Sequence, residues 1–324
     1  MSGTARGDDG QKHKATGGQR GTNMAASVRT RLTALAHTRG EETEYVLTRF
    51  ALERLLYRLA QSPHASTFIL KGALLFALWE DHPHRATRDA DLLGFGPPEV
   101  DRIAQVFRDL CAVPVDDDGL LFLPETVRAR RIREQQEYGG IRVVLLAGLG
   151  TARLRAQVDV GFGDVVTPMP QAIDFPTLLD LPAPHLRVYP RETVVAEKYE
   201  AMVRLGMTNT RMKDFYDLLA LSRQFAFEGP ALAAAMRATF TRRGTDFAAL
   251  PPVALTDEFA NNVGKQAAWQ SFLKRSKLAG AGLSLQAMIQ ELRAFLLPVA
   301  EALAAGAEFD RKWIPSDQWH APAN

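Results

Sequence analysis

Three aspartates stand on two predicted strands where their carboxylates could share a metal ion. Asp89 and Asp91 belong to a predicted strand at 89–93, and Asp159 lies on the polar side of a predicted strand at 153–162. Residues two apart in a strand point to the same face, so Asp89 and Asp91 project together. Grouped carboxylates repel one another unless a cation is present, and such hard oxygen ligands suit Mg²⁺ with a phosphate completing its shell. The pattern indicates magnesium-dependent nucleotide chemistry.

A lysine and a glycine, Lys71 and Gly72, stand between a predicted strand at 66–70 and a predicted helix at 73–79. The missing side chain and the free amides at the start of a helix could cradle a phosphate. Taken singly, glycine more often only punctuates a turn, and an aspartate more often ends a turn or faces solvent than binds a metal. The ordered combination is what favours a nucleotide site.

Two further candidates lie on predicted helices in the second half of the chain. Lys198 has helical spacing to apolar neighbours, which places its charge on or beside the apolar stripe, where a lysine usually extends to solvent. Asp214 and Asp217 are one turn apart, and both fit a solvated helix face paired with Lys213 or Arg211. For Asp217 this solvated position and a functional role are equally favoured.

The elements that must position these residues divide the chain into two parts. The first part mixes predicted helices and strands, which is typical of an α/β or α+β domain, with helices at 25–36, 42–59 and 99–111 and further strands at 140–147 and 153–162. From residue 190 onward the pattern is almost wholly helical, with predicted helices at 191–205, 212–225, 230–241, 257–277 and 284–305. The prolines of the stretch 180–190 favour a linker. We therefore predict an α/β domain over 24–187 and a helical domain over 188–324.

The first 23 residues are rich in glycine and charge and hold no apolar core, so they are predicted to be a disordered tail, with Met24 as an alternative start. This tail holds four of the 39 basic and two of the 37 acidic residues, which leaves 35 of each. A polyanion site must therefore come from local basic runs, which are solvated faces by default and could hold RNA phosphates if they border the cleft: Arg128, Arg130, Arg131 and Arg133; Arg242 and Arg243; Lys274, Arg275 and Lys277.

Composition excludes several classes of protein. The 324 residues are 46% hydrophobic and 23% charged, an ordinary globular balance that excludes general disorder and a coiled-coil rod. Apolar runs end well short of the ~18 residues that a membrane span needs, so no membrane partner is expected. The single cysteine, Cys111, cannot form an internal disulfide, which favours the reducing cytoplasm.

A set of motifs in a fixed order covers most of residues 60–225. They are Lys71-Gly72-Ala73-Leu74, the segment Arg85 to Leu92, the segment Val158 to Asp164, the segment Ala196 to Ala201, and the segment Arg211 to Leu218. In these motifs the chain resembles the AbiEii/AbiGii-type toxins, the nucleotidyltransferases of type IV toxin–antitoxin and abortive-infection systems. The resemblance implies a polymerase-β-like nucleotidyltransferase domain followed by helices, with the active site between them.

The resemblance also implies roles for the site residues. Asp89 and Asp91 are expected to hold two Mg²⁺ ions, and Asp159 to bind one of them and assist deprotonation of the acceptor hydroxyl. The NTP phosphates are expected to contact Lys71, Gly72 and Lys198, with Asp214 positioning Lys198 or the acceptor. The hydroxyl or glycine that often follows the motif glycine is Ala73 here, so Thr87 is expected to supply a hydroxyl beside the metal site instead.

Related toxins imply an RNA acceptor, the tRNA 3′ end in particular, and restraint by an antitoxin protein encoded alongside. The residues themselves leave other acceptors open, since protein nucleotidylation or phosphate transfer from GTP would use much the same site. A non-catalytic nucleotide-binding module is the alternative of another class. Retention of three mutually repelling carboxylates and Lys198 argues against it.

Overall fold

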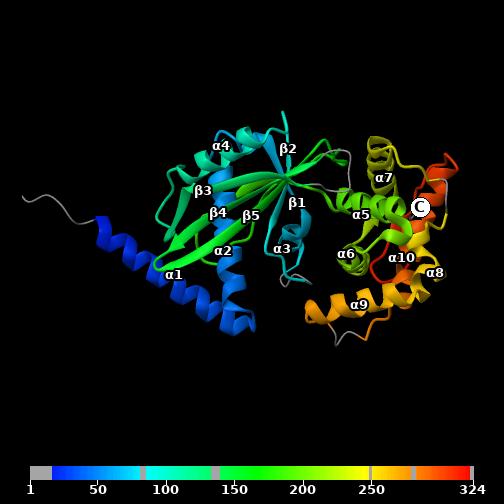
Figure 1. Cartoon of the computed structure of the whole chain (residues 1–324). Helices are drawn as coiled ribbons and strands as arrows, with labels where there is room; N and C mark the ends of the chain where they lie inside the picture. The colour runs from blue at the N-terminus through cyan, green and yellow to red at the C-terminus, as the bar shows by residue number, and fades with distance from the viewer. Residues whose placement is uncertain (1–16, 81–84, 133–138, 248–249, 279–281, 322–324) are drawn as a thin grey trace, which may run out of the picture.

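The computed structural model describes residues 17–80, 85–132, 139–247, 250–278 and 282–321, without the side chains of 17–22. A half built on a β-sheet and a half built from helices lie side by side (Figure 1). Within the described ranges, no helix is long and apolar enough to span a bilayer.

The described residues of the first half form a mixed seven-stranded sheet with the order β3-β4-β5-β2-β1-β7-β6. Its strands are β1 (Phe68–Lys71), β2 (Ala90–Gly94), β3 (Leu120–Ile132), β4 (Gly140–Leu149), β5 (Ala152–Phe162), β6 (Gln171–Asp174) and β7 (His185–Val188). The pairs β2/β5 and β1/β7 are parallel and the remaining neighbours are antiparallel. The predicted strands at 66–70, 89–93, 140–147 and 153–162 are therefore confirmed within a few residues.

Helices cover one face of this sheet. Contacts reach β3, β4 and β5 from α1 (Gly17–Arg39), α2 (Thr43–Ala60) and α4 (Val100–Cys111). The apolar alternation of β5 is buried as predicted, from Leu154 to Phe162. The opposite face carries the polar residues of β5, including Asp159. The turn after β1 is a 3₁₀ helix, η2 (Gly72–Leu75), followed by the short α3 (Phe76–Trp79).

Two parts of the sheet escape the sequence pattern. In β3, the burial phase changes between Phe122 and Val127, because a register shift between Leu123 and Arg128 breaks the alternation. The predicted linker at 180–190 is wrong, since β7 lies within it and pairs with β1 through Leu70 and Val188. Its prolines bound the strand rather than exclude it.

The second half confirms the predicted helices, with α5 (Arg191–Leu205), α6 (Met212–Gln224), α7 (Gly229–Arg243), α8 (Asp257–Asn261), α9 (Val263–Arg275) and α10 (Leu285–Ala304). The predicted helix 257–277 is two helices, because the Asn262 side chain caps α9 by accepting from the Lys265 amide. In the described part of the chain, β8 (Phe227–Glu228), β9 (Lys312–Trp313) and β10 (Trp319–His320) add a three-stranded sheet that was not predicted. A strand of two residues is too short to show an alternation of apolar and polar side chains in the sequence. Three further 3₁₀ turns are η1 (Ala65–Thr67), η3 (Gly206–Thr208) and η4 (Val253–Leu255).

The predicted segment boundaries differ from the observed elements at two points. Helix α1 begins at Gly17, inside the predicted tail 1–23, and residues 1–16 lie outside the described residues. Its anchors are the buried Ala25, Val28, Leu32 and Ala36, and extending a helix beyond such anchors costs little once it is nucleated. Strand β7 ends at Val188, one residue beyond the predicted boundary at 187.

Candidate active site

A cleft of about 1010 Å³ lies between the sheet and the helical half. Both halves contribute to its lining, the sheet from β1, β2, β3, β4 and β5 and the helices from α5, α6 and α7. The lining includes each of the residues that the sequence analysis selects as site candidates, namely Lys71, Gly72, Thr87, Asp89, Asp91, Asp159, Lys198 and Asp214. Residues more than 140 positions apart in the sequence are thus brought to one surface.

A row of charged residues crosses five strands of the sheet. Lys71 on β1 pairs in register with Asp91 on β2, which lies opposite Asp159 on β5. Asp159 in turn lies opposite Arg142 on β4, which lies opposite Arg130 on β3. Paired residues of neighbouring strands share a face. The charged row therefore places two carboxylates between a lysine on one side and two arginines on the other.

The turn at Gly72 requires glycine for two reasons. Its φ of +75° lies in the left-handed region, which disfavours any side chain. A Cβ at this position would lie 2.0 Å from Asp91 Oδ2, well inside contact distance. The glycine thus lets the backbone after β1 approach the carboxylate of Asp91 closely, as the predicted phosphate cradle needs.

Asp89 and Asp91 form an acidic pair at the start of β2. Burial, together with the nearby charge of Asp89, raises the pKa of Asp91 to about 7. The Thr87 hydroxyl donates a hydrogen bond of 2.6 Å to Asp89 Oδ1, so it lies beside the pair as predicted. A cation bound by both groups would relieve the repulsion between two neighbouring carboxylates. These two aspartates fit a divalent cation.

Asp159 is held in a different way. Arg142 donates to both of its carboxylate oxygens, at 2.8 Å and 2.6 Å. Among the described residues, no group of three or more acidic, histidine or cysteine side chains is arranged to hold a metal ion. Asp159 nevertheless lies opposite Asp91 in register, and its carboxylate is paired with Arg142. The sequence gives no sign of this pair, which depends on the register of β4 against β5.

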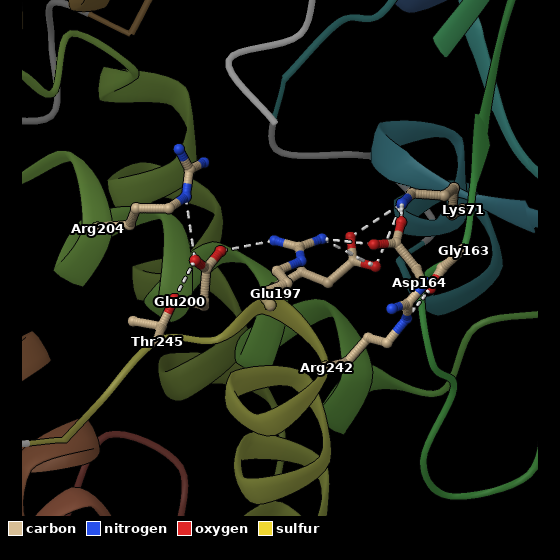
Figure 2. A network of polar contacts seen from close by, with 9 residues as sticks. Lys71, Gly163, Asp164, Glu197, Glu200, Arg204, Arg242 and Thr245 are labelled. Atoms are coloured by element: carbon tan, nitrogen blue, oxygen red, sulfur yellow. Dashed lines mark hydrogen bonds and ion pairs between the residues drawn. The ribbon is translucent and has the colours of Figure 1, made fainter. Parts of the chain in front are cut away.

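Lys71 is part of a network of ion pairs that joins the two halves (Figure 2). Its Nζ lies 2.7 Å from Asp164, which follows β5, and 3.0 Å from Glu197 on α5. Arg243, at the end of α7, contacts Asp164 at 2.9 Å and Glu200 at 2.7 Å. Burial acts to raise the pKa of Asp164, but the ion pairs with Lys71 and Arg243 outweigh it and hold that pKa below its usual range. The predicted solvated face at Arg243 is thus wrong, since this side chain is only 13% exposed.

Lys198 is held in a second network. Its Nζ lies 2.7 Å from Asp214 and 2.8 Å from Asp217. Arg85 donates to both oxygens of Asp217, at 2.6 Å and 2.8 Å. The side chain of Asp217 is fully buried, so its predicted alternative as part of a solvated helix face is wrong. Asp214 orients Lys198 towards the cleft from α6, which is the contact that the sequence analysis expects.

The basic runs are divided between different environments. Arg130 and Arg131 line the cleft from β3, whereas Arg133 lies outside the described residues. Lys277 pairs with Glu42 at 3.0 Å on the surface. Arg85, Arg142 and Glu197 also line the cleft and have no counterpart among the predicted site residues. Arg85 and Glu197 stand inside two of the quoted motifs, close to Thr87 and Lys198, whereas only the pairing of β4 with β5 brings Arg142 there.

Comparison with known proteins decides the family. The sequence profile described as "Nucleotidyl transferase AbiEii toxin, Type IV TA system" matches residues 54–291, which include every candidate site residue. The chain belongs to the AbiEii family. The AbiEii match begins within α2 and ends within α10, so it spans the whole cleft and both halves of the chain. No curated protein matches the sequence.

Two solved structures resemble this AbiEii-family chain. The crystal structure of JHP933 from Helicobacter pylori is 12% identical, with 82% of this chain and 95% of that chain covered and a TM-score of 0.47. A second H. pylori crystal structure, assigned as a nucleotidyltransferase, is also 12% identical, with 83% and 100% covered and a TM-score of 0.47.

Proposed function

We propose that this nucleotidyltransferase joins a nucleotide from an NTP to the terminal hydroxyl of an RNA, with the tRNA 3′ end as the acceptor. The observation that carries the proposal is the meeting of Lys71, Gly72 and Asp91 from the sheet with Lys198 from α5 in one cleft. The sheet side thus supplies anion-binding and cation-binding groups and α5 supplies a further anion-binding group, as a triphosphate with its counter-ion requires.

In the proposed reaction the acceptor oxygen forms a bond to the α-phosphorus while the bond between the α- and β-phosphates breaks. The acceptor loses its proton and pyrophosphate leaves. Asp89 and Asp91 would hold Mg²⁺, which when bound would neutralise charge developing on the triphosphate. Lys71 and Lys198 would orient the phosphates, since their ammonium groups are fixed by the carboxylates of Glu197 and Asp214.

Asp159 would accept the proton of the acceptor hydroxyl in this scheme. Its carboxylate oxygens both accept hydrogen bonds from Arg142, so its orientation is fixed before the substrate arrives. Each of these oxygens has a second lone pair, so Asp159 can accept the proton while Arg142 keeps its hydrogen bonds.

At the cellular level, we propose that this reaction inhibits growth in the cytoplasm until a cognate antitoxin protein restrains it. Membership of a type IV toxin family supports this role. Induction of the chain alone is expected to arrest growth, and induction together with the neighbouring gene product to restore it. Growth unaffected by the chain alone would contradict a toxin role.

Nucleotide transfer and phosphate transfer are distinguished by which phosphate of the NTP reaches the acceptor. Purified protein is incubated with Mg²⁺, total cellular RNA and protein, and each NTP labelled at either the α- or the γ-phosphate. Nucleotide transfer predicts label in small RNA from an α-labelled NTP only. Label in protein would move the acceptor to protein, and label from γ-labelled GTP would make the chain a phosphotransferase.

A further inference from the structure

The open face of the sheet beside the cleft carries arginines from three neighbouring strands. Arg128 and Arg130 belong to β3, Arg142 to β4, and Arg153 and Arg155 to β5. The register places all five on one face, because Arg130 lies opposite Arg142, and Arg142, Leu146 and Gly148 of β4 lie opposite Asp159, Arg155 and Arg153 of β5. We call these five residues the arginine track.

The arginine track is open to solvent. Arg128, Arg130, Arg153 and Arg155 are exposed, and Arg142 is partly exposed. The intervening residues of β4 point to the other face and are fully buried beneath helices, as Ile141, Val143, Leu145 and Ala147 are. The helices therefore cover the apolar face, and the basic face of the same three strands stays accessible.

The arginine track is continuous with the candidate active site. Arg130 and Arg142 belong to the charged row that contains Asp159 and Asp91, and Arg130, Arg142 and Arg155 line the cleft itself. Strands rise about 3.4 Å per residue, so Arg153 lies about 20 Å along β5 from Asp159. A single-stranded RNA segment of several nucleotides is long enough to span that distance with its 3′ end at the aspartates.

The charge of this face is local. The chain without its first 23 residues has equal numbers of acidic and basic residues, so a cluster of five arginines on one open face is not a consequence of bulk charge. Arginine is the side chain best suited to phosphate, because its planar fork donates two parallel hydrogen bonds. Repeated phosphates along a flexible strand match repeated arginines along a sheet.

We propose that the arginine track binds the phosphates of the acceptor RNA and guides its 3′ end to Asp159 and Asp91. This inference rests on the proposed function, which supplies the acceptor, and adds the surface on which that acceptor lies. It identifies residues outside the NTP site as determinants of RNA affinity. Arg142 is the residue of the arginine track that also donates hydrogen bonds to the carboxylate of Asp159.

The test measures equilibrium binding of unfractionated tRNA in the absence of NTP, at several salt concentrations. The variant replaces Arg128, Arg153 and Arg155 by glutamine, and a matched control replaces the exposed Arg31, Arg108 and Arg237 on other surfaces. Each phosphate that the variant no longer neutralises is expected to reduce the slope of log affinity against log salt by about 0.7–0.9. The track variant should therefore bind on the order of 10- to 100-fold more weakly near 0.1 M salt, and the control should bind as the unmodified protein does.

A second variant separates charge from structure. Lysine at the same three positions keeps the charge and is expected to keep most of the salt slope. Unchanged binding by the glutamine variant, an equal loss in the control, or equally strong competition by a polyglutamate peptide would each overturn the proposal.

Label transfer is measured in parallel, so that the two proposals fail separately. Transfer to RNA by the unmodified protein with unaltered tRNA binding by the glutamine variant would reject the arginine track alone. Track-dependent tRNA binding without any transfer would reject the proposed reaction and keep the surface.

Discussion

The carboxylate of Asp91 occupies the space that a side chain on Gly72 would need. A Cβ on Gly72 would lie 2.0 Å from Asp91 Oδ2 and 2.7 Å from its Cβ. The turn that follows β1 and the carboxylate of β2 are therefore fitted to each other. Any change that separates them also changes the proposed phosphate cradle and cation site together.

Gly72→Ala is expected to abolish nucleotide transfer. The new methyl group must displace Asp91, and alanine at a φ of +75° costs about 1–2 kcal/mol in addition. The matched control is Gly244→Ala, where φ is +62° and no atom lies within 4 Å of the new Cβ. Thermal unfolding and transfer assays on both variants should show a loss of stability in each, larger in Gly72→Ala, but loss of transfer only in Gly72→Ala. Equal transfer by the two variants would contradict the fit between Gly72 and Asp91.

Arg243→Gln is expected to lower the free energy of unfolding by about 3 kcal/mol, since it removes one of the cations that neutralise a group of buried carboxylates. Asp164, Glu197 and the fully buried Glu200 all lie within 3.5 Å of its guanidinium (Figure 2). Chemical denaturation measures this loss. Arg223→Gln is the control, because it breaks an exposed pair with Glu291 that is worth about 0–1 kcal/mol. Similar losses for the two variants would show that the network does not hold the halves together.

The stability of the metal-free protein is expected to fall as pH rises from about 4 to about 7. The pKa of Asp91 is about 7 in the folded chain against an ordinary value of 3.8. Between these values the unfolded chain releases a proton that the folded chain keeps, so the free energy of unfolding decreases with pH. Asp91→Asn should flatten this dependence by on the order of 1–3 kcal/mol, measured by denaturation at pH 5 and pH 8.

The response of the melting temperature to Mg²⁺ should distinguish Asp91 from a second buried acid, Glu53. Burial raises the pKa of Glu53 to about 7 as well, but Glu53 lies on α2, outside the lining of the cleft. Millimolar Mg²⁺ is expected to raise the melting temperature at pH 8 in the unmodified protein and in Glu53→Gln, but not in Asp91→Asn. Equal stabilisation of all three would place the cation elsewhere.

Local pattern was sufficient to predict the central strands and the residues that they carry into the cleft. The alternation of β5 identifies which face Asp159 occupies, and the strand, glycine and helix at Lys71 need only neighbouring residues. What could not be predicted depends on register and tertiary pairing. Arg142 meets Asp159 only because β4 and β5 pair as they do, and Arg243 reaches Asp164 across the junction of the two halves.

The irregular strands failed for a different physical reason. Because of the register shift in β3, the buried residues are even-numbered up to Phe122 and odd-numbered at Val127. A single alternation of apolar and polar residues therefore does not run through the strand. Strand β7 lies between Pro184 and Pro190, and parallel pairing with β1 overrides the local preference of the prolines for a linker. The arginines of β3 are exposed, as expected for a solvated run, but their place on one face with Arg142 and Arg155 depends on the pairing of the strands.

The central claim, that the carboxylates in this cleft support nucleotide transfer, is tested most directly by Asp91→Asn. The substitution keeps the size of the side chain and removes its charge beside Gly72. With α-labelled NTPs, Mg²⁺ and total small RNA, we predict at least a 100-fold loss of label transfer, on the order of the loss of one catalytic group. The exposed Asp310→Asn is the control and should transfer at the unmodified rate. Transfer by Asp91→Asn at the unmodified rate would contradict the account.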